Sequence, residues 1–124
     1  MTIEPLPSDG ELEILRVLWS TGPATVKAIH EHLPRRREVG YNTVGKLLAI
    51  MEGKGFVARD ETSRAHVFRP LIDRDQAQRG FVRDLADRAF GGSPAALALR
   101  ALGETPPTAD EIAELRALLA ELEE

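Results

Sequence analysis

The residues best suited to chemistry are polar side chains on one predicted helix, set among unusually small neighbours. Residues 41–53 place apolar side chains at helical spacing, so one face should be buried: Val44, Leu47, Leu48 and Met51. The opposite face then carries Asn42, Lys46, Ala49 and Gly53, flanked by Gly45 and Ile50. Side chains this small let a helix come close to the base edges in the major groove of duplex DNA.

Three of the polar groups match known nucleic-acid contacts. Asn42 can form a paired hydrogen bond to adenine, Lys46 can reach guanine or a phosphate, and Tyr41 can bind a phosphate. Each has a plainer alternative as well. Asn42 or the adjacent Thr43 could cap the helix, Lys46 could be solvated, and Tyr41 could pack against the protein.

Positive charge is concentrated around this helix, although the whole chain carries −4. Residues 35–69 hold eight Lys/Arg and four Asp/Glu, a net +4, whereas residues 72–124 hold six and eleven, a net −5. A connector precedes the helix with Arg35, Arg36 and Arg37, and Arg64 lies between two predicted strands. Because a phosphate backbone responds to local charge, we expect phosphate contacts here. Solvated surface charge is the alternative.

Capping patterns and periodicity define the elements around this helix. Ser8 with Glu11 has capping-box spacing and begins a first helix, and Thr25 should cap a short second helix that stops at Pro34. Residues 56–60 and 65–71 alternate as two strands of a hairpin, and the pattern after residue 73 is helical. The expected fold is mainly α with a small β-hairpin wing: a winged helix-turn-helix DNA-binding domain over residues 1–71 and a helical dimerisation domain over residues 72–124.

The C-terminal helices carry more apolar residues than such short helices can bury alone. We expect these residues to form the interface of a homodimer: Phe81, Leu85, Phe90, Ile112, Leu115, Leu118, Leu119 and Leu122. The alternative is that part of this surface folds back on the chain's own winged helix.

The sequence argues against several other classes of function. It has no cysteine, and His30, His32 and His66 are not spaced as a metal cluster. It has no phosphate-binding loop, dinucleotide fingerprint, zinc-protease motif or nucleophile elbow. We therefore expect no enzyme activity, no metal and no cofactor. No apolar run reaches the roughly 20 residues that a membrane helix needs, and no signal peptide is visible. No membrane association and a cytoplasmic location are expected.

Several segments together resemble the BlaI/MecI/CopY (penicillinase-repressor) family of bacterial transcriptional regulators. They are ELEILRVLW, TVKAIHEHL, YNTVGKLLAIMEGKGFVARD, RAHVFRP and FGGS. The resemblance implies an N-terminal winged helix, a helical dimerising region, and repression through a palindromic operator on double-stranded DNA. It also implies that Thr43 and Lys46 lie at recognition-helix positions used on DNA, and that Arg64 lies in the wing.

Two departures from the family pattern limit what the resemblance implies. Antibiotic-responsive members are inactivated by a regulatory protease that cuts an Asn–Phe bond, and Gly80 here replaces that Asn before Phe81. The replacement argues against control by that cleavage. Copper-responsive members use C-terminal cysteines, which this chain lacks.

The most direct interpretation is a sequence-specific DNA-binding transcriptional repressor that binds its operator as a homodimer. A winged-helix protein-interaction module and a ligand-responsive one-component regulator are the alternatives.

Overall fold

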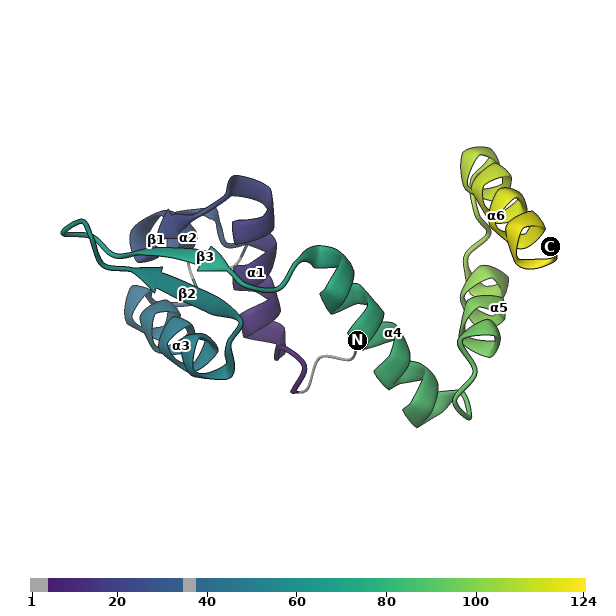
Figure 1. The fold of residues 1–124 in the computed structure, drawn as a ribbon, viewed down its shortest axis with the longest axis horizontal. Coiled ribbons are helices and arrows are strands. Elements are labelled where there is room, and N and C mark those ends of the chain that lie inside the picture. The colour runs from purple at the N-terminus through teal and green to yellow at the C-terminus, as the bar shows by residue number, and fades with distance from the viewer. Residues whose placement is uncertain (1–4, 35–37) are drawn as a thin grey trace. The chain divides into compact units, whose positions relative to one another are not determined.

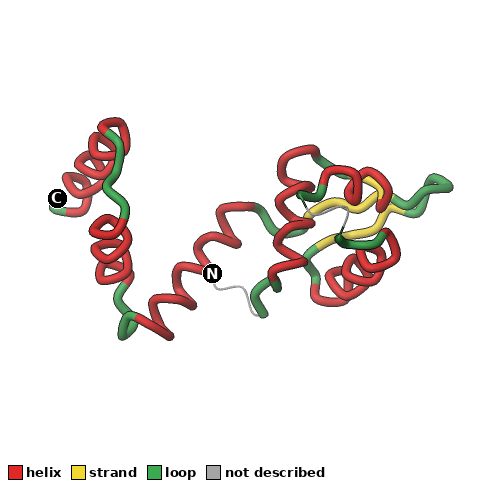
Figure 2. The backbone as a smooth tube through the Cα atoms, turned by 180° about the vertical axis from the view of Figure 1, so that it is seen from behind, coloured by secondary structure: helices red, strands yellow, loops and turns green. Residues whose placement is uncertain are grey.

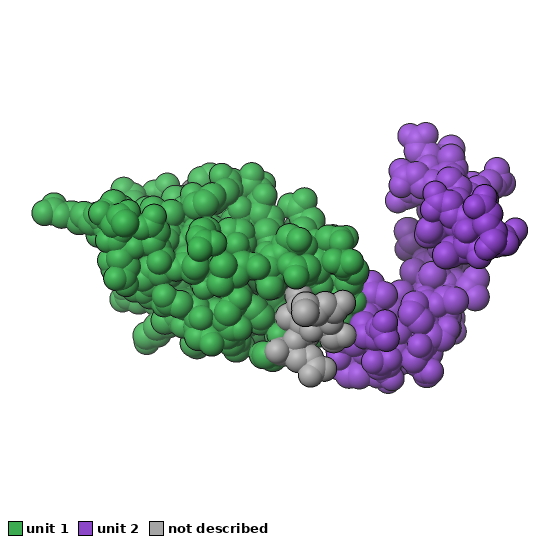
Figure 3. All heavy atoms as spheres, viewed as in Figure 1, with its two compact units in different colours: residues 1–81 green, residues 82–124 purple. Residues whose placement is uncertain are grey.

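The structure is a computed structural model that describes residues 5–34 and 38–124. The chain divides into two compact units, Met1–Phe81 and Val82–Glu124 (Figure 3). This division falls inside a helix, whereas the functional boundary predicted from the sequence lies between residues 71 and 72. The assignment of DNA binding and dimerisation to those two regions stays a prediction.

The first unit contains a winged helix-turn-helix (Figure 1). Its elements are α1 (Asp9–Thr21), β1 (Ala24–Thr25), α2 (Val26–His32), α3 (Tyr41–Lys54), β2 (Val57–Asp60) and β3 (Val67–Pro70). The predicted caps are confirmed: Ser8 and Glu11 form both bonds of a capping box, and the Thr25 side chain accepts from the Ala28 N–H. Gly55 ends α3 at φ 82°, a left-handed conformation that glycine adopts without strain.

The start of α3 differs from the capping alternatives considered for the sequence. The N-cap is Gly40, whose position carries no side-chain capping bond, and Tyr41 is already helical. Asn42 and Thr43 therefore lie inside the first turn, and the interpretation of either residue as the cap is wrong. Both side chains are exposed and available for other contacts.

The β-structure has one strand more than the predicted hairpin. In the described part of the chain, the antiparallel sheet has the order β1-β3-β2, with Ala24 opposite Phe68 and Arg59 opposite Phe68 on its other side (Figure 2). The two-residue strand β1 is too short to show alternation, so it left no periodic signal in the sequence. It ties the start of α2 to the base of the wing.

The core of this unit is apolar and draws on every one of these elements except β1. Its members are Ile14, Leu15, Val17, Leu18, Ile29, Leu33, Val44, Leu48, Met51, Phe56, Val57 and Phe68. Val44, Leu48 and Met51 are fully buried and Leu47 partly so, which confirms the predicted inner face of α3. Each such side chain contributes about 1.5–3 kcal/mol relative to its exposed state, so burial fixes which face of α3 remains outside.

Helix α4 (Arg74–Ala89) begins in contact with α1. The indole N–H of Trp19 donates to the Ile72 carbonyl at 2.9 Å, and the Arg74 guanidinium lies 5.8 Å from the centre of the Trp19 ring. A cation over an indole face is attracted to it. These contacts, with the burial of Ala77, fix the first turn of α4 on the winged helix.

The second unit contains the end of α4 and two further helices, α5 (Pro94–Glu104) and α6 (Ala109–Leu122). Ser93 caps α5 ahead of Pro94, and Thr108 with Glu111 forms a capping box on α6. Neither helix contains a single buried residue. No helix within residues 5–34 and 38–124 is long and apolar enough to cross a membrane.

An ion pair with a buried carboxylate joins the start of α1 to the end of α3. Glu11 is 2% exposed, and its two carboxylate oxygens accept from Lys54 Nζ at 3.1 and 3.0 Å. Burial by itself raises the pKa of the Glu11 carboxyl. The hydrogen bond from the Ser8 N–H and the Lys54 ammonium outweigh burial and lower that pKa below its ordinary 4.5.

Replacing Glu11 should make the fold less stable and less sensitive to acid. A lowered pKa in the folded state gives stability that is complete above pH 4.5 and is lost as the pH falls through the folded value. We expect Glu11→Gln to reduce the free energy of unfolding by about 1–3 kcal/mol at pH 7, and by less at pH 3.5. Urea denaturation at both pH values measures this.

Glu61→Gln is the matched control for this prediction, because Glu61 is exposed in the hairpin turn. It should leave the stability at pH 7 nearly unchanged. Equal losses of stability from pH 7 to pH 3.5 in wild type and Glu11→Gln would contradict the role given to the ion pair.

Candidate nucleic-acid interface

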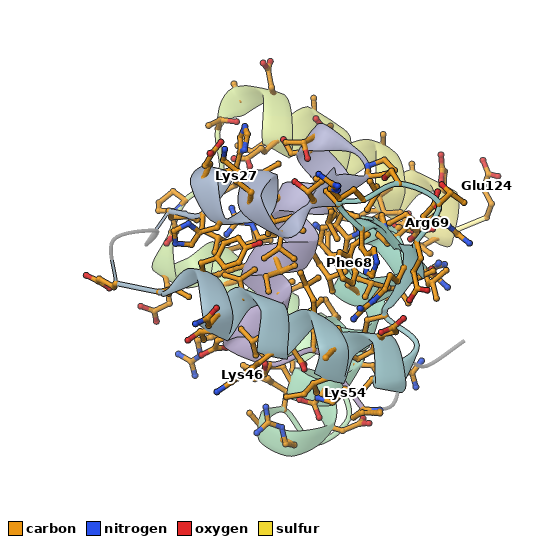
Figure 4. All side chains as sticks on the ribbon, turned by 90° about the vertical axis from the view of Figure 1, so that its left-hand side faces the viewer. Lys27, Lys46, Lys54, Phe68, Arg69 and Glu124 are labelled. Carbon is orange, nitrogen blue, oxygen red and sulfur yellow. The ribbon has the colours of Figure 1, made fainter. Side chains whose placement is uncertain are left out.

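The outer face of α3 is open to solvent. Asn42, Thr43 and Lys46 are exposed in its first half, and Ile50 is 51% exposed one turn further on. Figure 4 shows Lys46 extending outward from α3 and Lys27 outward from α2, with Phe68 in the interior. The side of α3 that the sequence analysis assigned to a ligand is therefore not covered by the winged helix itself.

A groove of about 510 Å³ lies beside this face, between α2, the first half of α3 and the wing. It is lined by Thr25, Val26, Lys27, Tyr41, Gly45, Arg59, Arg64, Ala65, His66 and Phe68. Its lining contains three cationic side chains and no carboxylate. A concave surface of one charge concentrates the field that an anion meets, so this groove suits a polyanion.

The structure brings together only part of the predicted site in this groove. Tyr41 and Arg64 both line it, although they are far apart in sequence. Asn42, Thr43 and Lys46 lie on the adjoining face of α3 instead. The connector Arg35, Arg36 and Arg37 lies outside the described residues, so its predicted phosphate contacts stay a prediction.

Tyr41 packs in part against the protein, in agreement with one of its two interpretations, and its phosphate contact stays a prediction. Its ring meets the His30 ring edge-on, with centroids 6.4 Å apart and an interplanar angle of 78°, yet the residue is 53% exposed. His30 Nε2 in turn bonds the Val39 carbonyl at 2.7 Å, which holds the chain just before α3. The contact with His30 orients the phenol, and about half of the residue stays accessible to solvent.

Local hydrogen bonds shape the turn that carries Arg64. The Thr62 N–H donates to Asp60 Oδ1 at 2.9 Å, and the Ser63 hydroxyl donates to the Ala65 carbonyl at 2.8 Å. The Thr62 bond lowers the pKa of the Asp60 carboxyl, which is thereby favoured in its charged form. Arg64 is exposed within this turn, so its side chain is free to meet a ligand.

Lys27, Arg59 and His66 also line the groove, although the sequence did not predict them as site residues. The sequence could have indicated Lys27 as an anion contact. It lies in the first turn after the capping Thr25, and the N-terminus of a helix favours anions. Arg59 and His66 belong to the two opposite arms of the hairpin. Only the strand register brings their side chains together, so no local sequence pattern indicated this contact.

Gly45 occupies the middle of α3 with open space beside it. A Cβ built at this position meets no atom within 4 Å, so nothing in the described chain requires a glycine there. Glycine inside a helix costs about 0.5–1 kcal/mol relative to alanine. The small residue therefore leaves room on the groove side of α3 without any packing reason inside the protein.

The residues predicted for dimerisation differ widely in their exposure. Leu85, Leu118, Leu119 and Leu122 are exposed, the last at 71%, and Ile112 is 37% exposed. Phe90 and Leu115 are half-buried. Phe81 is half-buried too, and it lines a small cavity of about 160 Å³ with Leu12 and Trp19 of α1.

The three histidines of the chain make separate contacts. His30 bonds the Val39 carbonyl, His32 Nδ1 bonds the Ala28 carbonyl at 2.8 Å, and His66 meets Arg59. Across residues 5–34 and 38–124, no three His, Asp or Glu side chains are grouped so that they could hold a metal ion.

Fold and groove together define a winged helix-turn-helix protein with a cationic surface beside an exposed helix. The sequence model of the penicillinase repressor family matches residues 7–121, nearly the whole chain. The chain therefore belongs to the penicillinase repressor family, which confirms the resemblance found in its sequence.

Individual relatives agree with this membership. The chain is 37% identical to the transcriptional regulator BlaI of Mycobacterium tuberculosis over 118 residues, which is 92% of this chain and 84% of the relative. It is 24% identical to the penicillinase repressor of Bacillus licheniformis over 117 residues, 94% and 91% of the two chains. The solution structure of the DNA-binding domain of the repressor BlaI superposes with a TM-score of 0.52 at 25% identity, covering 61% of this chain and 93% of that domain.

Gly45→Ala should stabilise the protein, since the new methyl group meets no atom and helix propensity rises. We expect the free energy of unfolding to increase by about 0.5–1 kcal/mol. Gly55→Ala is the matched comparison: its surroundings are equally open, but φ of 82° strains alanine, so a loss of about 1–2 kcal/mol is expected. Chemical denaturation of both variants checks this. A destabilised Gly45→Ala would show that position 45 is constrained from inside the fold.

Proposed function

We propose that this chain is a transcriptional repressor that binds a palindromic operator on double-stranded DNA as a homodimer. It uses no enzyme activity or cofactor and works in the cytoplasm, where the bacterial chromosome lies. The observation that carries the proposal is the exposed polar face of α3 directly beside a groove lined by Lys27, Arg59 and Arg64.

In this proposal α3 enters the major groove and the wing follows the phosphate backbone. Asn42, Thr43 and Lys46 face the base edges, and Gly45 lets the helix come close to them. Tyr41, Arg64 and the Arg35, Arg36 and Arg37 connector contact phosphates, which position the protein without reading sequence. Membership of a family that includes named repressors supports the same interpretation.

The proposed dimer interface lies on the C-terminal helices. Since α5 and α6 bury no residue within one chain, their leucines lack the core that normally stabilises short helices. A second copy of the chain would supply it. Two copies related by twofold symmetry also present two α3 helices to a twofold-symmetric operator, about one turn of DNA apart.

Release by cleavage before Phe81 is not part of the proposal. Gly80 not only replaces the asparagine of the family cleavage site but is also buried within the continuous helix α4. A protease acts on exposed, extended chain, so this bond would become accessible only if α4 unwound.

The ligand-responsive alternative has one observation in its favour. A hollow of about 580 Å³ lies between α5 and α6, lined mainly by apolar residues. Leu115 and Leu118 belong to its lining, however, and both are in the proposed dimer interface. We therefore place a second subunit, rather than a small molecule, against this surface.

Lys46→Ala tests whether α3 reads DNA sequence. If Lys46 contacts a base, the variant should bind the operator more weakly by about 1–3 kcal/mol while binding of random duplex changes little. Fluorescence anisotropy with a duplex from the gene's own upstream region, and with a scrambled duplex, measures both affinities. Arg100→Ala is the control, because it removes one exposed charge from α5. Wild type that binds neither duplex at low salt would refute the proposed function.

A charge placed in the leucine surface of α6 should separate the dimer. Each leucine buried at an interface contributes about 1.5–3 kcal/mol, and a carboxylate would be unpaired there. We expect wild type to sediment as a dimer and Leu119→Glu as a monomer at micromolar concentration. Leu71→Glu, at an exposed leucine between β3 and α4 that lies outside the predicted interface, should stay dimeric. A monomeric wild type would remove dimerisation from the proposal.

A further inference from the structure

We propose that Arg59 is a positioning residue that holds the wing at a fixed distance from α3 and so determines how strongly the protein discriminates its operator from other DNA. The inference rests on the proposed DNA-binding function. It assigns Arg59 a role distinct from that of a phosphate contact, which its place in a cationic groove would otherwise suggest.

From its place on β2, the guanidinium of Arg59 contacts one residue of α3, one of the wing loop and one of β3. Its Nη2 pairs with Glu52 Oε1 of α3 at 3.1 Å, and its Nη1 lies 3.4 Å from Nδ1 of His66, which directly precedes β3. Its Cζ lies over the Phe68 ring, 5.0 Å from the ring centre. One side chain thus connects the helix, the base of the wing and the core.

The charge of Arg59 is already paired with a carboxylate of the protein itself, that of Glu52. Its side chain is only 26% exposed, and its Nε is buried without a hydrogen-bond partner among the described residues. A buried, unsatisfied donor is costly, so the stacking and the two end contacts must hold the group where it is. A side chain held in this way is poorly placed to follow a DNA phosphate.

The contact with His66 also favours one tautomer of that imidazole. Arginine can only donate, so the contact requires a neutral ring that accepts at Nδ1 and carries its proton on Nε2. Arg64, the predicted wing contact, is two residues before His66 in the same turn. Through His66 and Phe68, the position of Arg59 sets where Arg64 stands relative to the exposed face of α3.

A positioning residue and a phosphate contact predict different results for Arg59→Met. Loss of a phosphate contact weakens binding of every duplex and reduces the salt dependence of binding by about 0.9 in the log–log slope. Loss of positioning leaves that slope unchanged and lowers the ratio of operator to scrambled-duplex affinity. We expect that ratio to fall by roughly three- to tenfold.

Glu52→Gln gives the sharper test, because the two explanations predict changes in different quantities, the overall affinity in one case and the affinity ratio in the other. Removing a carboxylate near DNA should tighten binding of all duplexes if only charge matters. If Glu52 instead anchors Arg59 to α3, the variant should lose discrimination in the same direction as Arg59→Met. Glu52 is partly exposed, so the change should not prevent folding.

Arg69→Met is the matched control. Arg69 lies on the neighbouring strand β3, is exposed, and forms no ion pair or hydrogen bond with α3 among the described residues. It removes the same charge from the same sheet and should leave the affinity ratio unchanged. The probes are a duplex selected from a random pool by the wild-type protein, and a scrambled duplex of the same composition.

A measurement without DNA examines the contact itself. In the nitrogen NMR spectrum of the free protein, His66 should show the Nε2–H form in wild type and a mixture of both neutral forms in Arg59→Met. Wild type that binds no duplex refutes the proposed function. If the wild type binds DNA, two results for the variants would overturn only the role of Arg59. One is that the variants keep the full affinity ratio, and the other is that they show a reduced salt dependence of binding with the ratio unchanged.

Discussion

The Glu11–Lys54 ion pair sets the constraint on which the rest of the winged helix depends. It joins the beginning of α1 to the end of α3, and Glu11 serves at the same time as half of the capping box that starts α1. The inner face of α3 is thus held by the ion pair at the C-terminal end of the helix and by the burial of Val44, Leu48 and Met51 along its length. Because all these attachments lie on one side, the other side remains free for a ligand.

The same arrangement explains how the site can be both rigid and open. The exposed face of α3 contributes little to stability, so its residues are free to be chosen for contact with a partner. The groove beside it is made by elements that the sheet fixes in place: β1 holds the start of α2, and β2 and β3 carry the wing. Arg59 adds a direct link between α3 and that wing.

Local chemistry made much of this fold predictable from the sequence. Capping at Ser8, Thr25, Ser93 and Thr108 depends on residues three apart, and the inner face of α3 follows from spacing alone. What could not be predicted depends on long-range pairing. Strand β1 exists only because β3 lies beside it, and Glu11 finds Lys54 across 43 positions. The N-cap of α3 is Gly40, which has no side chain to form a capping bond, so no residue type in the sequence indicated where this helix starts.

Helices α5 and α6, which bury nothing within one chain, have a consequence for the living cell. On the dimer proposed above, an isolated copy has an incomplete C-terminal half, so repression requires two copies to meet before either acts. The number of complete molecules then grows faster than the number of chains synthesised. A gene controlled in this way would switch from transcribed to silent over a narrow range of regulator abundance.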